Sequence, residues 1–311
     1  MEKNGWRLHA DADLNSLQAL WRRAYSEHIF QQYDLNAAWA RIFGESQPRN
    51  SRGFQIRIWI HESPLMILPW VRRDGNLHWL GHGLLDYADP LGPPGELAEA
   101  ILPEEAGVWN LRGIRAHSPW QPVFQRLARA TRSELEHLSF APFCGDMTAA
   151  ELETKHGRVA GRWHDLERQG VGCEAVREMT ERQQLLRQML QWKQRRMGED
   201  NILRELEAAW LGEAAACDFC ELWQLGNDAA WAGFLTWRQG HTRYGYLLAH
   251  DPERARASPG IMLLYAVLRR TLADGMRLDF LTGEQGFKLR FATGREELLC
   301  LRGSARVDFQ R

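Results

Sequence analysis

The stretch that decides the fold covers residues 244–268 and reads YGYLLAHDPERARASPGIMLLYAVL. Its alternating first part predicts a strand, and the polar loop that follows contains Arg254 and Arg256. Ser258 is of a type preferred just before a helix, and Pro259 suits the first helical position because proline lacks the N–H that would be unpaired there. The sequence therefore predicts a strand, a basic loop and a helix that begins at Pro259.

A helix start of this kind attracts anions, because its first N–H groups lack partners inside the helix and lie at the positive end of the helix dipole. We expect the backbone at Ser258, Gly260 and Ile261, with the guanidinium groups of Arg254 and Arg256, to bind phosphate or pyrophosphate. An ordinary capped helix after a polar loop is the alternative. The first turns of this helix are apolar on nearly all sides, which predicts a buried helix whose N-terminus opens into a cleft.

A second informative block covers residues 274–291 and reads DGMRLDFLTGEQGFKLRF. It predicts a turn, a strand at 277–281 and a short helix at 285–292. Upstream of both blocks, the periodicity predicts helices at 150–169, 181–197 and 202–211 and three antiparallel strands over 217–250. This order of elements indicates an α+β fold with mixed sheets.

The N-terminal half predicts a similar order of elements. Its expected helices are 14–30, 36–43, 97–102 and 120–130, and its expected strands are 52–61, 65–71, 77–80, 108–111 and 134–140. A hairpin turn is predicted at Asp74-Gly75-Asn76. The segment 141–145 is the expected junction, so we predict two domains over residues 1–145 and 146–311.

The ordered set of motifs resembles the CelD-like (cellulose-biosynthesis-associated) branch of the GNAT N-acyltransferase superfamily. In that branch a DPE…SPG.LL block and a DF..G.E.YK..W block recur at about this separation. Three further segments are similar to the family: LGHGLLDYADPL at 80–91, GRVAGRWHDLERQG at 157–170 and WKQRRM at 192–197. Two departures are Phe287, where the family often has tyrosine, and a phosphate-binding loop that is present only as the residues 256–260.

The resemblance implies two tandem GNAT-like halves, each a mixed, mostly antiparallel sheet flanked by helices. This arrangement is similar to the duplicated one of the Fem-type aminoacyl transferases. The resemblance also implies acyl transfer from acetyl-CoA or another acyl-CoA to an amine on a sugar, a cell-wall precursor or a polysaccharide intermediate. The pyrophosphate of coenzyme A would then lie at the helix that begins at Pro259.

Acyl transfer to an amine needs a base for the amine proton and donors to the developing oxyanion, and it needs no catalytic triad. His250 is a candidate base, with a solvated loop histidine as the alternative. Lys288 occupies the family's lysine position, where it would neutralise an anionic group while Glu284 acts as a base; the two residues are four apart and would otherwise pair with each other. Asp86 lies in the family's DY.DPL segment as a substrate-binding or basic residue, whereas Asp89 precedes a proline and is expected to form a turn.

Four further residues are expected to face the acceptor. Tyr87 lies in the DY.DPL segment, and Lys193 and Arg196 keep the family's K..R spacing, which places them on one face of a helix. Arg162 lies four residues after Arg158 on the preceding helix, and like charges at this spacing weakly destabilise an isolated helix. An anionic partner is the functional interpretation of both helices, and a solvated charged face is the alternative.

The composition disfavours several classes of protein. A net charge of −1 over 311 residues gives no overall field that attracts nucleic acid or a membrane surface. Five scattered cysteines indicate reduced thiols in a cytoplasmic protein. Cys217-Asp-Phe-Cys220 lies in a strand-like pattern without a second pair, so no metal site is expected. We also expect no signal peptide and no membrane insertion.

Two other functions fit the same pattern. Fem-like transfer of an aminoacyl group from charged tRNA needs a basic surface, which the near-zero net charge disfavours. The other alternative is a catalytically silent GNAT-fold scaffold, or partner-binding protein, of a polysaccharide or export assembly. The incomplete phosphate loop and the lack of an obvious base keep this alternative open.

Overall fold

The computed structural model describes residues 2–10, 13–46, 53–95 and 107–305, and the helix expected at 97–102 lies outside them. The predicted α+β class is confirmed, because helices alternate with the strands of mixed sheets. The chain forms two compact units, residues 1–140 with 296–311 and residues 141–295. The C-terminal residues are therefore part of the first unit, whereas the sequence predicts them in the second domain.

The sheet of the first unit contains a meander followed by a parallel strand. Its strand order is β1 (Glu2–Lys3), β2 (Trp6–Ala10), β3 (Phe54–Glu62), β4 (Leu65–Arg73), β5 (Asn76–Trp79), β6 (Gly107–Arg115), β13 (Gly294–Ala305) and β7 (Glu134–Cys144). Strands β3, β4 and β5 pair antiparallel, and β5 pairs parallel with β6. The turn predicted between β4 and β5 is confirmed, with positive φ angles of 51° at Asp74 and 79° at Gly75.

The helices of the first unit are short, and its core is rich in tryptophan. The helices are η1 (Leu14–Leu17), α1 (Gln18–Arg23), η2 (Ile29–Gln31), α2 (Tyr33–Glu45) and α3 (Gln121–Thr131). The single helix predicted at 14–30 is thus divided into shorter ones. Six buried tryptophans share one core cluster: Trp6, Trp59, Trp70, Trp79, Trp109 and Trp120.

The second unit repeats the meander with a parallel neighbour. Its strand order is the end of β7, β12 (Arg277–Asp279), β11 (Thr242–His250), β10 (Ala230–Gln239), β9 (Cys220–Gly226) and β8 (Gly172–Val176). Strands β9, β10 and β11 pair antiparallel, as predicted, and β11 pairs parallel with β12. Strand β8 is not predicted from the sequence, because its five residues show no apolar alternation.

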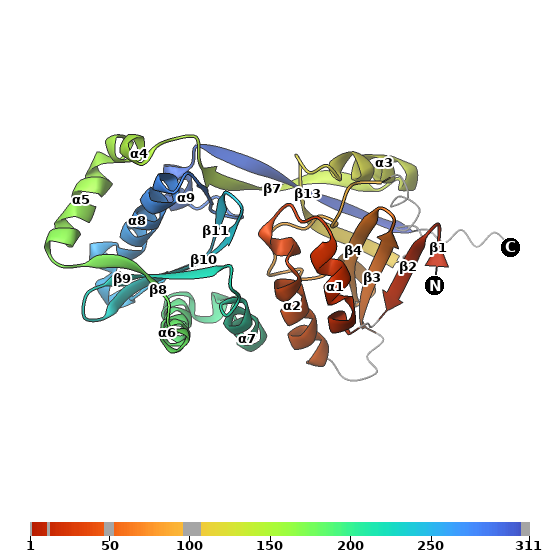
Figure 1. Cartoon of the computed structure of the whole chain (residues 1–311), viewed down its shortest axis with the longest axis horizontal. Helices are drawn as coiled ribbons and strands as arrows, with labels where there is room; N and C mark the ends of the chain where they lie inside the picture. The colour runs from red at the N-terminus through yellow and green to blue at the C-terminus, as the bar shows by residue number, and fades with distance from the viewer. Residues whose placement is uncertain (1, 11–12, 47–52, 96–106, 306–311) are drawn as a thin grey trace. The chain divides into compact units, whose positions relative to one another are not determined.

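Helices cover both faces of the second sheet. They are α4 (Ala149–Lys155), α5 (Gly157–Arg168), α6 (Met179–Met197), η5 (Gly198–Asp200), α7 (Glu205–Ala214), η6 (Pro252–Ala257), α8 (Pro259–Ala273) and α9 (Gly286–Phe291). Helices α6 and α7 lie on one face and α8 and α9 on the other (Figure 1). Gly233 of β10 lets α6 approach closely, since a Cβ atom there would lie 2.4 Å from the sulfur of Met189.

Arg243 on β11 is buried and joins three elements of the second unit. Its Nε and Nη2 donate to the carboxylate of Glu221 on β9 at 2.6 and 3.2 Å, and its Nη1 donates to the hydroxyl of Thr271 on α8. Asp274, just after α8, lies 3.8 Å from Nη2. A buried charge is stable only when its partners are in place, so this network fixes the C-terminal end of α8 on the sheet.

Each unit is completed by a strand from a distant part of the sequence. In the first unit, β13 pairs antiparallel with β6 along Gly107–Arg115. In the second unit, β12 pairs antiparallel with Phe143 and Cys144 at the end of β7. Strand β7 therefore begins in the first unit and ends in the second. Strand β13 follows the second unit in the sequence, but most of it belongs to the first unit.

A chain that ends at Arg295 is expected to lose the fold of the first unit. Strand β6 would lose its antiparallel partner, and the core would lose the buried side chains of Leu298, Cys300 and Leu301. Near-ultraviolet circular dichroism of the buried tryptophans and urea unfolding measure this loss, with a chain ending at Ala305 as the control. Cooperative unfolding with a native tryptophan spectrum in the shorter chain would contradict the prediction.

Candidate functional site

Helix α8 begins at Pro259, as predicted, but its start differs from the predicted cap. Ser258 adopts a left-handed conformation with φ of 53°, and its side chain makes no capping hydrogen bond. Its carbonyl instead accepts from the N–H groups of Ile261 and Met262 at 3.0 and 3.1 Å. The buried N–H of Gly260 has no acceptor among the residues that the structure describes, so this donor is available for water or a ligand.

Strand β12 is much shorter than its parallel neighbour β11. Their parallel pairing joins Thr242–Tyr244 to Arg277–Asp279, whereas β11 continues as far as His250. The chain turns away after β12, where the N–H of Leu281 donates to Oδ1 of Asp279 at 2.9 Å and Leu281 has a φ of 58°. The pairing of the two strands thus stops well before β11 reaches the N-terminus of α8.

His250, the last residue of β11, lies against the start of α8. A Cβ atom at Gly260 would lie 3.1 Å from Nδ1 of His250, so a larger residue there would be tight unless the imidazole shifted by a few tenths of an ångström. Burial lowers the pKa of His250 below its ordinary value, and the charges of Arg196 and Lys193 lower it further. The carboxylate of Asp251 acts in the opposite direction. The imidazole is therefore neutral at pH 7 and can accept a proton.

Lys193 and Arg196 lie on α6, which packs against β11 and η6. Helix α6 thus lies on the strand that ends at His250, and the charges of Lys193 and Arg196 both lower the pKa of this histidine. The ammonium group of Lys193 is half-buried, and burial followed by the charge of Arg196 lowers its pKa. Within the described part of the chain, neither Lys193 nor Arg196 makes an ion pair or a side-chain hydrogen bond.

Three predicted site arginines in or beside η6 differ in their surroundings. Arg254 is 3.8 Å from the carboxylate of Asp251, and its guanidinium lies over the ring of Trp231 at 4.7 Å. Arg256 is exposed and makes no ion pair with any described residue. Arg162 on α5 donates to the carbonyl of Ala257 at 3.2 Å, which places it beside the start of α8. Of these cations, Arg256 is the one that remains available for an anion.

Glu284 and Lys288 do not form the helical pair that their spacing allows. Helix α9 begins at Gly286, so Glu284 precedes the helix, and it is exposed without an ion pair to the described residues. Nζ of Lys288 donates to the carbonyl of Thr282 and lies 3.5 Å from that of Leu281. Lys288 therefore holds the loop between β12 and α9. The prediction that Glu284 and Lys288 pair on one helix is wrong, because Glu284 lies outside the helix.

Asp86 and Tyr87 belong to the first unit, whereas the other predicted site residues belong to the second. Asp86 is half-buried in the segment after β5. Tyr87 is buried, with its ring centroid 5.8 Å from that of His28 and 5.6 Å from that of Phe30, both in edge-to-face geometry. The ring of Tyr87 is thus part of a packed aromatic cluster.

Asp89 has a larger role than the turn that the sequence predicts. Its buried carboxylate accepts from Nε of Arg115 at 2.8 Å and lies 3.4 Å from Nε2 of His28, while Arg115 also pairs with Glu27. Burial alone would raise the pKa of Asp89, but the neighbouring His28 and the charge of Arg115 lower it overall. Burial lowers the pKa of His28 to about 4. No local sequence signal connects Asp89 with Arg115, which is why sequence reasoning missed this network.

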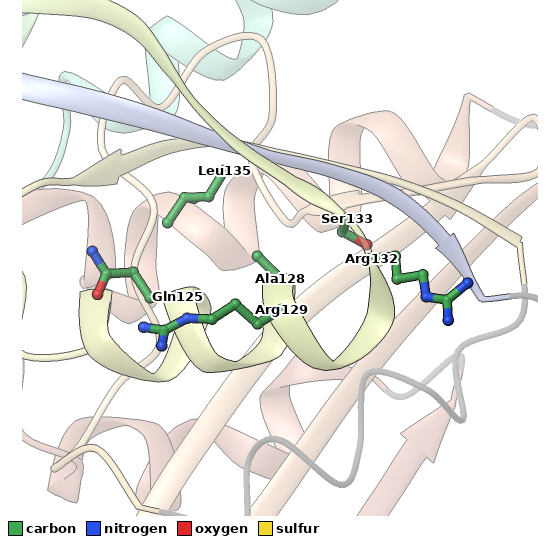
Figure 2. Close-up of a pocket in the computed structure, with 6 residues that line it drawn as sticks. All are labelled: Gln125, Ala128, Arg129, Arg132, Ser133 and Leu135. Carbon is green, nitrogen blue, oxygen red and sulfur yellow. The ribbon is translucent and has the colours of Figure 1, made fainter.

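Described residues of the first unit line a small cavity and a surface hollow. A small cavity of about 10 Å³ is lined by twelve residues that include His28, Tyr87 and Asp89, and it is large enough for about one water molecule. A surface hollow of about 570 Å³ lies between α3 and β7 and is lined by Gln125, Ala128, Arg129, Arg132, Ser133 and Leu135 (Figure 2). Its two guanidinium groups point away from each other in Figure 2, so they do not converge on one ligand.

The geometry around α8 agrees with a family comparison. Residues 154–289 match the family model described as an acetyltransferase (GNAT) domain. This GNAT match extends from α4 into α9, so it includes α6, His250, η6 and the start of α8. No curated protein sequence matches the chain.

Solved structures share the fold of the whole chain. L-PGS from Bacillus licheniformis has a TM-score of 0.60 at 10% identity, with 96% of this chain and 93% of that chain covered. The C-terminal domain of a protein assigned as a lysylphosphatidylglycerol synthetase from Agrobacterium fabrum gives 0.59 at 13%, with 94% and 92% covered. FemX gives 0.58 at 10%, with 93% and 96% covered. At these identities the likeness concerns the fold.

Membrane-spanning helices, metal-binding clusters and cysteine pairing are three further features that bear on function. None of the helices there combines the length and the apolar character needed to cross a bilayer. No group of three or more His, Cys, Asp or Glu side chains there is arranged to hold a metal ion. The five cysteines are free thiols.

Replacing Asp89 by Asn is expected to destabilise the protein by about 3 kcal/mol, because the largely buried Arg115 would lose its buried carboxylate partner and keep only the more exposed Glu27. Urea unfolding at pH 7 measures this change. Asp34→Asn is the matched control, since its ion pair with Arg22 is exposed and contributes at most about 1 kcal/mol. Equal stabilities of the two variants would refute the role assigned to Asp89.

Replacing Arg196 by Gln is expected to raise the pKa of His250 toward its ordinary value. Removal of a nearby positive charge favours the protonated imidazole, which is the charged form. Nuclear magnetic resonance titration of the His250 ring measures the change, and Arg187→Gln, at an exposed position on the same helix, is the control. An unchanged or lower pKa in Arg196→Gln would show that the two side chains do not interact.

Proposed function

We propose that this chain is an N-acyltransferase that uses an acyl-CoA as donor and an amine as acceptor. The observation that carries the proposal is the start of α8, where the N–H of Gly260 lacks an acceptor among the described residues and Arg256 lacks an ion pair there. Both lie within the stretch that matches the acetyltransferase (GNAT) domain. Helix N-termini with adjacent cations bind phosphate groups well.

In this proposal the donor binds at the N-terminus of α8. The pyrophosphate contacts the N–H of Gly260, with charge from Arg256. The N–H groups of Ser258 and Ile261, which the sequence also predicts as contacts, already donate to the carbonyls of Ala255 and Ser258. Arg254 contributes less, because Asp251 and Trp231 already engage its guanidinium. The acyl arm extends along β11, where β12 no longer pairs with it.

The reaction needs a nucleophilic attack by the acceptor amine and a general base that removes the amine proton. The acceptor nitrogen attacks the thioester carbonyl carbon, a carbon–nitrogen bond forms and the carbon–sulfur bond breaks. His250 takes the proton from the amine, since its lowered pKa keeps the imidazole neutral at pH 7. The sulfur leaves as thiolate and is protonated from solvent. Lys288 supports the loop beside this site through the carbonyl of Thr282, and Glu284 has no assigned step.

The class of acceptor follows from the resemblance to the CelD-like branch. That resemblance supports an amine on a sugar, a cell-wall precursor or a polysaccharide intermediate. Asp86 and Tyr87 carry the family's DY.DPL segment in the first unit, and their role toward the acceptor stays a prediction.

Fem-like aminoacyl transfer is the second candidate function. The observation that favours it is the likeness to FemX and L-PGS over nearly the whole chain. The same anion site would then bind the phosphate of a tRNA terminus. The match of residues 154–289 to an acetyltransferase model favours the acyl-CoA donor instead.

Acetyl-CoA and longer acyl-CoA compounds are expected to bind the wild-type chain in isothermal titration calorimetry. Arg256→Ala should weaken this binding by about tenfold to a hundredfold, because one charge-assisted contact to phosphate is lost. Arg187→Ala, at an exposed position on α6, is the control and should bind as the wild type does. Affinity that Arg256→Ala leaves unchanged would remove the proposed phosphate site.

The choice of ligand also separates the candidate functions. Binding of aminoacyl-tRNA without binding of any acyl-CoA would favour the Fem-like function. Binding of neither would favour a non-catalytic scaffold. Thermal stabilisation of about 2.7 kcal/mol is expected at a hundred times the dissociation constant of a true ligand.

A further inference from the structure

We infer that the first unit has a binding site for one internal water molecule, which His28, Trp79 and Asp89 hold in the small cavity that they line together. The proposed reaction does not use this site, so the inference does not depend on the choice of donor or acceptor. It selects water over an ion of similar size, and it gives this water a role in fixing the segment 86–91.

The cavity is lined by buried polar side chains that lack partners. His28, Trp79 and Asp89 each have at most 3% of their surface exposed. Among the residues that the structure describes, Nε1 of Trp79, Oδ1 of Asp89 and both ring nitrogens of His28 have no hydrogen-bond partner. The other carboxylate oxygen of Asp89 accepts from Nε of Arg115 at 2.8 Å. Because buried polar groups are almost always paired with protein or with ordered water, this cluster indicates a bound molecule.

The size of the cavity limits what it can hold. Its volume of about 10 Å³ is close to what a single water molecule needs. A carboxylate, a phosphate or a sugar ring is larger and would have to displace buried side chains. Cavities stay dry when their walls are apolar, whereas three side chains of this wall are polar and lack partners among the described residues.

The numbers of donors and acceptors select water. The indole N–H of Trp79 only donates and the carboxylate of Asp89 only accepts, whereas a neutral imidazole has one donor and one acceptor nitrogen. Nε2 of His28 lies 3.4 Å from Oδ2 of Asp89, which favours the proton on Nε2 and leaves Nδ1 as the acceptor. Burial keeps this imidazole neutral at pH 7, because it lowers the pKa of His28 to about 4.

One water molecule matches this set. Its oxygen accepts from the indole N–H of Trp79, and its two O–H groups donate to Oδ1 of Asp89 and Nδ1 of His28. An ammonium ion has donors alone and would leave the indole N–H of Trp79 unpaired. A chloride ion accepts alone and would be repelled by the carboxylate of Asp89.

The bound water joins three parts of the chain that are distant in sequence. His28 precedes η2, Trp79 ends β5, and Asp89 belongs to the segment 86–91. Gln31 of η2 donates through Nε2 to the carbonyl of Asp89 at 3.2 Å, so the backbone of this segment is held beside its side chain. The water therefore completes the contacts that fix the segment on η2 and β5.

The indole N–H proton of Trp79 reports on the site directly. In nuclear magnetic resonance spectra we expect a nuclear Overhauser cross peak between this proton and water, with the sign of a water that tumbles with the protein. Trp120 is the matched control in the same core cluster, because its indole N–H donates to the carbonyl of Gly92 at 3.0 Å. The Trp120 proton should give no such cross peak. Absence of the cross peak at Trp79 as well would mean a dry cavity and would overturn the inference.

Ammonium distinguishes water from a cation of about the same size. The cross peak between Trp79 and water should be equally strong in ammonium chloride and in sodium chloride at the same concentration. Loss of the cross peak in ammonium chloride alone would assign the cavity to a cation and contradict the inference.

Replacing His28 by Phe removes one acceptor and keeps a ring of similar size. The lifetime of the bound water is expected to fall by about fivefold, because one hydrogen bond of about 1 kcal/mol is lost. Magnetic relaxation dispersion of water measures this lifetime, and His137→Phe, at an exposed position on β7, is the control. A lifetime that His28→Phe leaves unchanged would refute the role of His28. The wild-type cross peak at Trp79 tests the site even if this variant does not fold.

Discussion

The buried guanidinium of Arg243 is the interaction on which the candidate site depends. It joins Glu221 on β9 to Thr271 and Asp274 at the C-terminal end of α8, and all of these partners are needed to stabilise a charge removed from water. A helix held at one end on a rigid sheet has a defined direction. Its other end therefore lies at the last residue of β11, where Gly260 contacts His250.

The short pairing between β11 and β12 has a consequence for chemistry. Three residues of each strand pair, and the remainder of β11 reaches the N-terminus of α8 without β12 beside it. The site thus combines a strand edge, helix N–H groups and a neutral histidine within one unit. Polar groups there are incompletely paired among the described residues, which contrasts with the fully partnered Arg243, and such groups are where ligands bind.

The repeated order of elements was visible in the sequence, but the pairing of the strands was not. Both units contain an antiparallel meander followed by a parallel strand; the apolar periodicity predicts the order of the elements but not the parallel pairing. Nothing local in residues 294–305 shows that they pair with β6 of the first unit. Alternation specifies that a segment is a strand, whereas its partner depends on which sheet edge the folded chain leaves open.

The sequence by itself determined the meander 217–250, the bounds of α8 and the basic loop before it, because periodicity, Pro259 and local charge are properties of adjacent residues. Only the tertiary structure decided which charges remain available. Arg254 is engaged by Asp251 and Trp231, while Lys193 and Arg196 lie on α6, which packs on the strand that ends at His250. Likewise, Asp89 forms a buried network with Arg115 instead of a simple turn. Pairing of charges depends on distances between residues far apart in the chain, and spacing along the sequence does not contain those distances.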